Sequence, residues 1–126
     1  MNLPVQASEI ADAARRVLED VAPRLQGRDA FDARVAERLL ALLQRELVQS
    51  PHARQQELAG LQALLPGCGG DVSLEMLRSR LCEAIASGEL GREDDALVAH
   101  LWRTTLAQLA IDSPRYRWCD AAEGRV

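Results

Sequence analysis

Apolar residues recur every three or four positions along most of the chain, which is the spacing of one face of an α-helix. One such stripe covers residues 8–25 and a second covers residues 29–48, each with charged residues on its other side. Pro23 and Gly27 are expected to end the first helix. Ser50 and Pro51 have the pattern of an N-cap and a first-turn proline, so they predict a third helix after residue 50.

The loop PGCGGDVS at residues 66–73 separates the third predicted helix from a fourth. Ser73 or Asp71 is expected to cap this fourth helix, and Gly88 to end it. Acidic residues 93–95 then open a fifth helix, where negative charge complements the helix dipole. The fifth helix has six expected inward residues: Leu97, Val98, Leu101, Trp102, Leu106 and Leu109.

Short connections between the helices predict an all-α, up-and-down bundle of about five helices. Its composition agrees, because Leu and Ala supply 40 of the 126 residues and aromatic residues only 3%. We expect a single helical domain over residues 1–126, near the commonest domain size. Residues 112–126 are expected to form a C-terminal tail, because Pro114 prevents the last helix from continuing.

All 15 basic residues are arginine, so the chain contains no lysine. It therefore has no lysine to form a Schiff base or to hold pyridoxal phosphate, and none for a Walker-type phosphate loop. The net charge of −4 argues against nucleic-acid binding, which needs clustered positive charge. No apolar run approaches the roughly 20 residues that span a membrane, and residues 1–8 lack the features of a secretory signal. Three unpaired cysteines fit a cytoplasmic protein.

No residue pattern indicates an active site, a cofactor site or a metal site. The glycines of the 66–73 loop lack the ending of a phosphate loop and do not follow a strand, so we interpret the loop as a linker. His52 and His100 have no second His or Cys at metal-ligand spacing. His100 is expected on the polar side of its helix, away from Trp102. A catalytic role for this chain is therefore not expected.

Two features of the second predicted helix indicate binding. At about 100° per residue, Arg34, Arg38 and Arg45 fall within about 40° of one another, a row that can hold a carboxylate- or phosphate-rich surface. A solvated face with Glu37 nearby is the alternative. Glu46 falls among the apolar residues of the same helix, so it is expected to pair with an arginine or to reach solvent at the helix end.

The tail contains Tyr116 and Trp118, two of the four aromatic residues in the chain. Aromatic side chains beside Arg115 and Arg117 have the composition of an interface hot spot. The alternative is that they fold back over the core of the protein itself. The tail is thus a second candidate binding region.

The chain resembles a family of small bacterial helical proteins of unknown function. The resemblance runs from about Ser8 to Tyr116 and is carried by PRLQGRDAFDARVAERLLALLQREL (residues 23–47), LCEAIASGEL (81–90) and LAIDSPRY (109–116). Its members are encoded beside acyl-CoA dehydrogenases and kinases that resemble aminoglycoside phosphotransferases. The resemblance implies a partner subunit that such a kinase needs to phosphorylate a hydroxyacyl-CoA. It carries over no active site. The matching positions are Gly27, Arg28, Phe31, Arg34, Val35, Asp112, Pro114, Arg115 and Tyr116.

Two departures from the family pattern, in the Glu37–Arg38 region and near Gln108, point to a different kinase or substrate if these positions contact the partner. We therefore predict a non-catalytic accessory subunit in acyl-CoA or hydroxy-acid catabolism, whose partner is the kinase or an acyl-CoA dehydrogenase. The alternative is a module that binds acyl-CoA or another anionic metabolite through the arginine row. A homodimer is also compatible with the wide apolar arc. The expected partner-binding residues are Arg28, Arg34, Arg38, Arg45, Asp112, Arg115, Tyr116 and Trp118.

Overall fold

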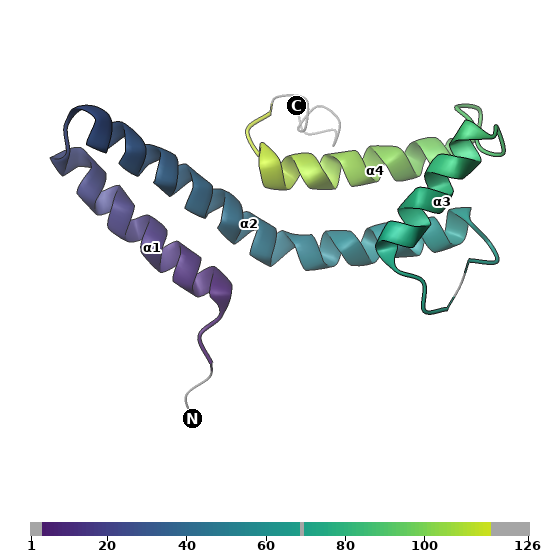
Figure 1. The fold of residues 1–126 in the computed structure, drawn as a ribbon, viewed down its shortest axis with the longest axis horizontal. Coiled ribbons are helices and arrows are strands. Elements are labelled where there is room, and N and C mark those ends of the chain that lie inside the picture. Colours follow the sequence, from purple (N-terminus) through teal and green to yellow (C-terminus); the bar gives the residue numbers. More distant parts are fainter. Residues whose placement is uncertain (1–3, 69, 117–126) are drawn as a thin grey trace. The chain divides into compact units, whose positions relative to one another are not determined.

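The computed structural model describes residues 4–68 and 70–116, which form helices joined by short connections. In these ranges it has four α-helices and one short 3-10 helix: α1 (Ala7–Val21), η1 (Ala22–Arg24), α2 (Gly27–Leu64), α3 (Leu74–Ala86) and α4 (Asp95–Asp112) (Figure 1). The predicted all-α class is confirmed. The predicted number of about five helices is corrected to four.

The difference in number lies at Ser50 and Pro51, where two predicted helices are one. α2 continues through Pro51 for 38 residues. Proline removes one backbone hydrogen bond from a helix, but its fixed φ of about −65° is itself helical. The segments on both sides are rich in Leu, Ala, Gln and Arg, which favour the helix strongly. The proline was therefore wrongly interpreted as the start of a new helix.

The chain divides into two compact units, which we call the N-terminal unit (Met1–Ser50) and the C-terminal unit (Pro51–Val126). α2 contributes its first half, residues 27–50, to the N-terminal unit and its second half, residues 51–64, to the C-terminal unit. The single domain over residues 1–126 stays a prediction, and residues 117–126 of its expected tail lie outside the described ranges.

Local signals set the helix ends, largely where the sequence placed them. The Ser73 hydroxyl accepts a hydrogen bond of 3.2 Å from the Met76 amide and caps α3, as predicted. Gly88, at φ +84°, follows the end of α3 and confirms the predicted stop. α1 begins at Ala7, one residue before the predicted stripe, with Gln6 as its N-cap and the Glu9 carboxylate accepting from the Gln6 amide at 3.1 Å.

The N-terminal unit is a helical hairpin whose buried residues are all small. α1 and the first half of α2 run antiparallel beside each other within this unit (Figure 1). The described residues of the unit with less than a tenth of their surface exposed are Ala11, Ala22 and Ala33. Alanine buries little apolar surface, so this contact contributes much less than the roughly 1.5–3 kcal/mol of a fully buried Leu or Phe side chain.

The C-terminal unit has a leucine-rich core. It is formed by α2, α3 and α4, with Leu61 of α2 and Leu77 of α3 fully buried. Two arginine–glutamate pairs, Arg54–Glu75 and Arg78–Glu57, also join α2 to α3. The buried residues of the core are Leu61, Leu65, Leu74, Leu77, Leu81, Ala84 and Leu97.

The prediction of the inward face of α4 is right only in part, because, of the six predicted residues, Leu97 is buried and Leu106 and Leu109 are half-buried. Leu97, His100 and Ile111 are buried. Trp102, which was expected inside, is 55% exposed, and Val98 and Leu101 are exposed as well. α4 has apolar or small residues around most of its circumference, so the periodicity does not single out one face. Packing against α2 decides instead which residues of α4 are buried.

Candidate functional site

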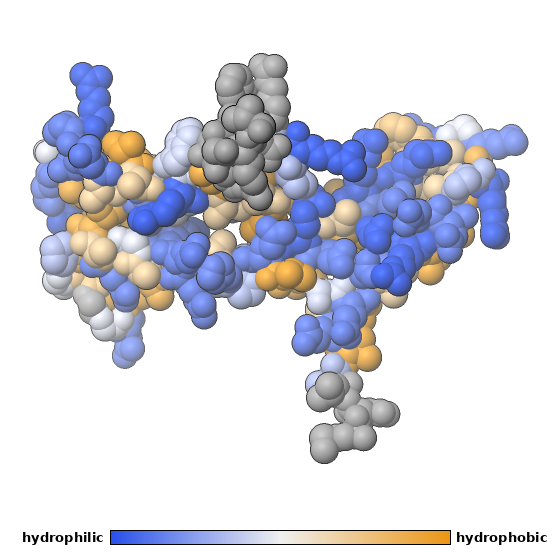
Figure 2. Space-filling view, turned by 180° about the vertical axis from the view of Figure 1, so that it is seen from behind, coloured by the Kyte–Doolittle hydropathy of each residue, from blue (hydrophilic) through white to orange (hydrophobic). Residues whose placement is uncertain are grey.

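The first half of α2 presents an unpartnered ridge of large apolar side chains, which we call the Phe31 face. Phe31 is 60% exposed and Leu39 is 59% exposed, although both are large apolar residues within α2. Spacing by four residues is the spacing of a helix ridge that fits the groove of another helix. The Phe31 face consists of Phe31, Val35, Leu39, Leu43 and Leu47. The space-filling view also shows hydrophobic residues, coloured orange, at the surface of the molecule (Figure 2).

The outward position of this face follows from what the hairpin buries. Ala33 is the one buried residue between residues 27 and 50, with Ala30, Leu40 and Ala41 half-buried on nearby turns. Small side chains let two helices approach closely, so the alanine side of α2 packs and the bulky side stays outside. Contiguous exposed apolar strips of this kind are typical of interaction sites on protein surfaces.

The predicted arginine row lies beside the Phe31 face. Arg34 and Arg38 are exposed and Arg45 is half-buried. At about 100° per residue, the row lies within about 60° of Phe31 around the helix. Cations therefore lie beside the Phe31 end of the apolar ridge, whereas Leu43 and Leu47 lie about 160° around the helix from Arg45.

Two further predicted residues belong to the same surface. Arg28 lies over the Phe31 ring, with its guanidinium carbon 5.9 Å from the ring centroid, and its Nε donates to Asp32 at 3.1 Å. Glu46 is exposed, so of the two expected alternatives it reaches solvent, although α2 does not end there as that alternative assumed. The apolar arc that surrounds Glu46 on the helical wheel faces outward itself, and no buried partner is needed.

The predicted tail residues belong to the C-terminal unit. Asp112 is the last residue of α4 and accepts a hydrogen bond of 2.9 Å from the Gln108 side chain. The chain then turns at Pro114 and Arg115, and the Tyr116 amide donates to the Ser113 carbonyl at 2.9 Å. Tyr116 is 47% exposed, whereas Trp118 lies outside the described residues. The tail and the arginine row thus lie in different units.

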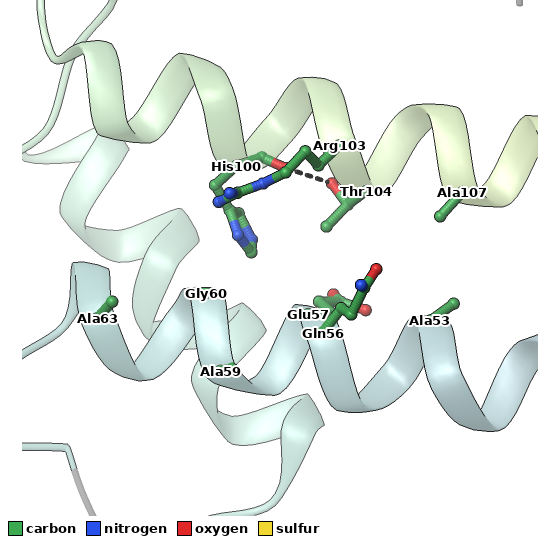
Figure 3. Close-up of a pocket in the computed structure, with 10 residues that line it drawn as sticks. All are labelled: Ala53, Gln56, Glu57, Ala59, Gly60, Ala63, His100, Arg103, Thr104 and Ala107. Carbon is green, nitrogen blue, oxygen red and sulfur yellow. Dashed lines mark hydrogen bonds between the residues drawn. The ribbon is translucent and has the colours of Figure 1, made fainter. Parts of the chain in front are cut away.

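A pocket in the C-terminal unit was not predicted from the sequence. It has a volume of about 370 Å³ and lies between the second half of α2 and α4 (Figure 3). The α2 side contributes small and polar residues at positions 53, 56, 57, 59, 60 and 63, and the α4 side contributes His100, Arg103, Thr104 and Ala107. Small residues at positions 53, 60 and 63 are the sequence signal that could have indicated it.

His100 is the central polar group of this pocket. Its side chain points from α4 toward Gly60 on α2 (Figure 3), and the residue is 3% exposed. The expectation that His100 lies on the polar face of its helix is therefore wrong. Burial lowers the pKa of its imidazole, although the nearby Glu57 carboxylate acts in the opposite direction. At neutral pH the buried ring is uncharged.

Glu57 and Arg78 form the strongest ion pair described at the pocket. The Arg78 guanidinium donates from Nε and from a terminal nitrogen to the two Glu57 oxygens, at 2.6 and 2.7 Å. This bidentate bond lowers the pKa of the Glu57 carboxyl. The carboxylate is thus charged and already compensated. Arg103, by contrast, is exposed and makes no ion pair among the described residues.

Neither a metal-ligand cluster nor a membrane-spanning helix is present among residues 4–68 and 70–116. No group of three or more His, Cys, Asp or Glu side chains lies together there. None of the described helices combines the length and the apolar character that crossing a membrane requires.

Comparison with known proteins gives one match. The model of a family described as a domain of unknown function, DUF6285, matches residues 23–116, which is most of the chain. No curated protein and no solved structure shows significant similarity to it. The match includes all of α2, α3 and α4, and with them both the Phe31 face and the pocket. The chain therefore belongs to the DUF6285 family.

Proposed function

We propose that this protein is a non-catalytic accessory subunit that binds a partner protein through the Phe31 face. The observation that carries the proposal is the arrangement of the hairpin, which buries alanines and leaves every residue of the Phe31 face more than a third exposed. Covering such side chains removes apolar area from water, which contributes roughly 25 cal/mol per Å². A partner that covers these side chains would gain the free energy of their burial, which the hairpin itself does not gain.

The shape and charge of the face indicate the kind of surface it takes. A ridge of side chains at a spacing of four residues fits an apolar groove between helices or on one helix. Arg34 and Arg38 on its border are exposed. Arginine at the rim favours a partner with carboxylates beside the groove, because opposite charges there speed and orient association.

The choice of partner rests on the resemblance to proteins encoded beside phosphotransferase-like kinases. In this proposal the chain binds and supports an aminoglycoside-phosphotransferase-like kinase in acyl-CoA or hydroxy-acid catabolism. Arg28, Phe31, Arg34 and Val35 are positions that match the family, and all four lie on or beside the Phe31 face. The tail residues Asp112, Arg115 and Tyr116 are a second proposed contact.

Co-purification of the chain with a phosphotransferase-like kinase from its native host tests the proposal. The kinase is assayed with and without this chain, and the affinity is measured for the wild type, for Leu39→Asp and for Met76→Asp. Met76 is 62% exposed on α3 and serves as a matched control for an exposed apolar residue in the C-terminal unit. We expect Leu39→Asp to weaken binding at least tenfold and to abolish stimulation of the kinase, and Met76→Asp to do neither.

Full kinase activity without the chain, together with no physical association, would contradict the proposal. Sedimentation of the chain alone tests whether the Phe31 face instead joins two copies of this protein. If Leu39→Asp turns a dimer into a monomer and no kinase binds, the Phe31 face is an interface between two copies rather than with a kinase.

A further inference from the structure

We propose that the pocket of the C-terminal unit binds a small organic anion with a carboxylate or phosphate head and a short aliphatic body. The inference goes beyond the proposed function, because the pocket lies on other residues than the Phe31 face and needs no partner protein. It rests on three features of the pocket: a buried histidine, the balance of charge and the apolar wall.

The first feature is a histidine whose ring lines the pocket. The His100 residue is 3% exposed, and its imidazole makes no hydrogen bond to another described side chain or backbone group. A ligand oxygen in the pocket would accept a hydrogen bond from the imidazole N–H.

The balance of charge favours an anion. The Glu57 carboxylate is the acid of the pocket, and Arg78 already compensates it through two hydrogen bonds. Arg103 then remains as a cation without an ion pair among the described residues, next to an uncharged imidazole that can donate one hydrogen bond. Guanidinium groups bind carboxylates and phosphates through two parallel hydrogen bonds.

The remaining residues of the pocket wall indicate the size and polarity of the rest of the ligand. Ala53, Ala59, Ala63 and Ala107 supply methyl groups, and Gln56 extends from α2 toward α4 (Figure 3). The Thr104 hydroxyl donates within its own helix, to backbone carbonyls at 3.1 Å, so it offers the ligand an acceptor. A volume of about 370 Å³ is near the lower end of the roughly 300–1,000 Å³ of ligand pockets, which suits a chain of a few carbons.

Nuclear magnetic resonance of the full chain provides the test. The His100 ring signals are followed while butyrate, hexanoate, butyl phosphate or butylamine is added, and calorimetry gives each affinity. We expect saturable binding of the anions, shifts concentrated at the pocket, and no response to butylamine. Stronger binding of butyl phosphate would identify a phosphate head, and stronger binding of the carboxylates a carboxylate head; either agrees with the proposal.

Matched variants distinguish the pocket from general charge and general packing. Arg103→Gln should weaken binding at least tenfold, whereas Arg92→Gln, on an exposed arginine outside the pocket, should not. Ala107→Leu should fill the pocket and block binding, whereas Ala99→Leu, exposed on the same helix, should leave it intact. Both arginines are exposed, so these variants are expected to fold.

The protonation of His100 gives an independent readout. The charged groups that face it are Glu57 from α2, with Arg78 from α3, and Arg103 from α4. A bound anion adds negative charge beside the ring, so the imidazole pKa should rise on saturation. No saturable shift with any of the anions, equal binding of butylamine, or equal loss in Arg103→Gln and Arg92→Gln would overturn the proposal. Such a result would leave the proposed partner binding untouched.

Discussion

The imidazole of His100 occupies the space that a side chain on Gly60 would need. A Cβ built on Gly60 would lie 2.9 Å from the His100 Cε1 atom and closer still to Nδ1. Glycine in a helix interior costs roughly 0.5–1 kcal/mol relative to alanine. The close approach of α4 to α2 accounts for this glycine, and the contact lies at the pocket itself.

Gly60→Ala should therefore destabilise the protein, although alanine favours the helix. The added methyl group must displace a buried ring, and overpacking of this kind costs about 1–3 kcal/mol. In the background of His100→Ala the same substitution should stabilise, because only the helix preference remains. Urea unfolding of the four proteins measures the coupling. Equal effects of Gly60→Ala in both backgrounds would show that the contact has no energetic role.

Pro51→Ala should stabilise α2. The proline has no N–H to donate to the Leu47 carbonyl, and proline in a helix interior costs about 3 kcal/mol. Alanine restores the donor and fits the helix, so the midpoint of thermal unfolding should rise. Circular dichroism on heating checks this, with Pro66→Ala in the loop after α2 as the control expected to change little. A lower midpoint for Pro51→Ala would contradict the prediction.

The Glu57–Arg78 pair should contribute more to stability than the neighbouring Arg54–Glu75 pair. Its two hydrogen bonds are 2.6 and 2.7 Å long and Glu57 has 17% of its side chain exposed, whereas the other pair makes one contact of 3.4 Å between largely exposed side chains. After screening by solvent, Arg78→Gln should cost roughly 0.5–1 kcal/mol. Arg54→Gln should cost less.

The same comparison has a pH signature. The folded pKa of Glu57 lies below its usual value of 4.5, so the stabilisation is present above pH 4.5 and disappears as the carboxyl becomes protonated at lower pH. Denaturant unfolding of Arg78→Gln and the wild type should therefore converge in acid. A constant difference down to low pH would mean that Arg78 acts through packing alone.

Stability should also fall on mild acidification because of His100. The folded pKa of this group is depressed by burial below 6.5, so the unfolded chain takes up a proton first as the pH falls. The stability is complete above about pH 6.5 and is lost between that value and the folded pKa. Unfolding free energies measured from pH 7.5 to 5 should show this slope.

His52 is the matched control for this slope, because it is the other histidine and is exposed. His100→Gln should remove the dependence on pH in this range, whereas His52→Gln should retain it. If the two variants keep the same slope as the wild type, another group is responsible for it.

The sequence by itself determined the helical class and most helix ends. Ser73 caps α3, Gly88 follows its end, and α4 stops at Asp112 ahead of Pro114, all as predicted. These features depend on hydrogen bonds and backbone angles within one turn, so neighbouring residues are sufficient to decide them. The continuity of α2 through Pro51 was missed because proline suits both a first turn and, at a cost, a helix interior.

Tertiary structure decided which side of each helix is covered. On the first half of α2 the alanine side is buried and the large apolar side is exposed, the reverse of what hydrophobicity alone predicts. On α4 the buried face includes His100 and leaves Trp102 exposed. Gly60 on α2 has no side chain, so the His100 imidazole fits against α2 there. Such choices depend on the shape of a surface distant in sequence, and helical periodicity contains no information about that shape.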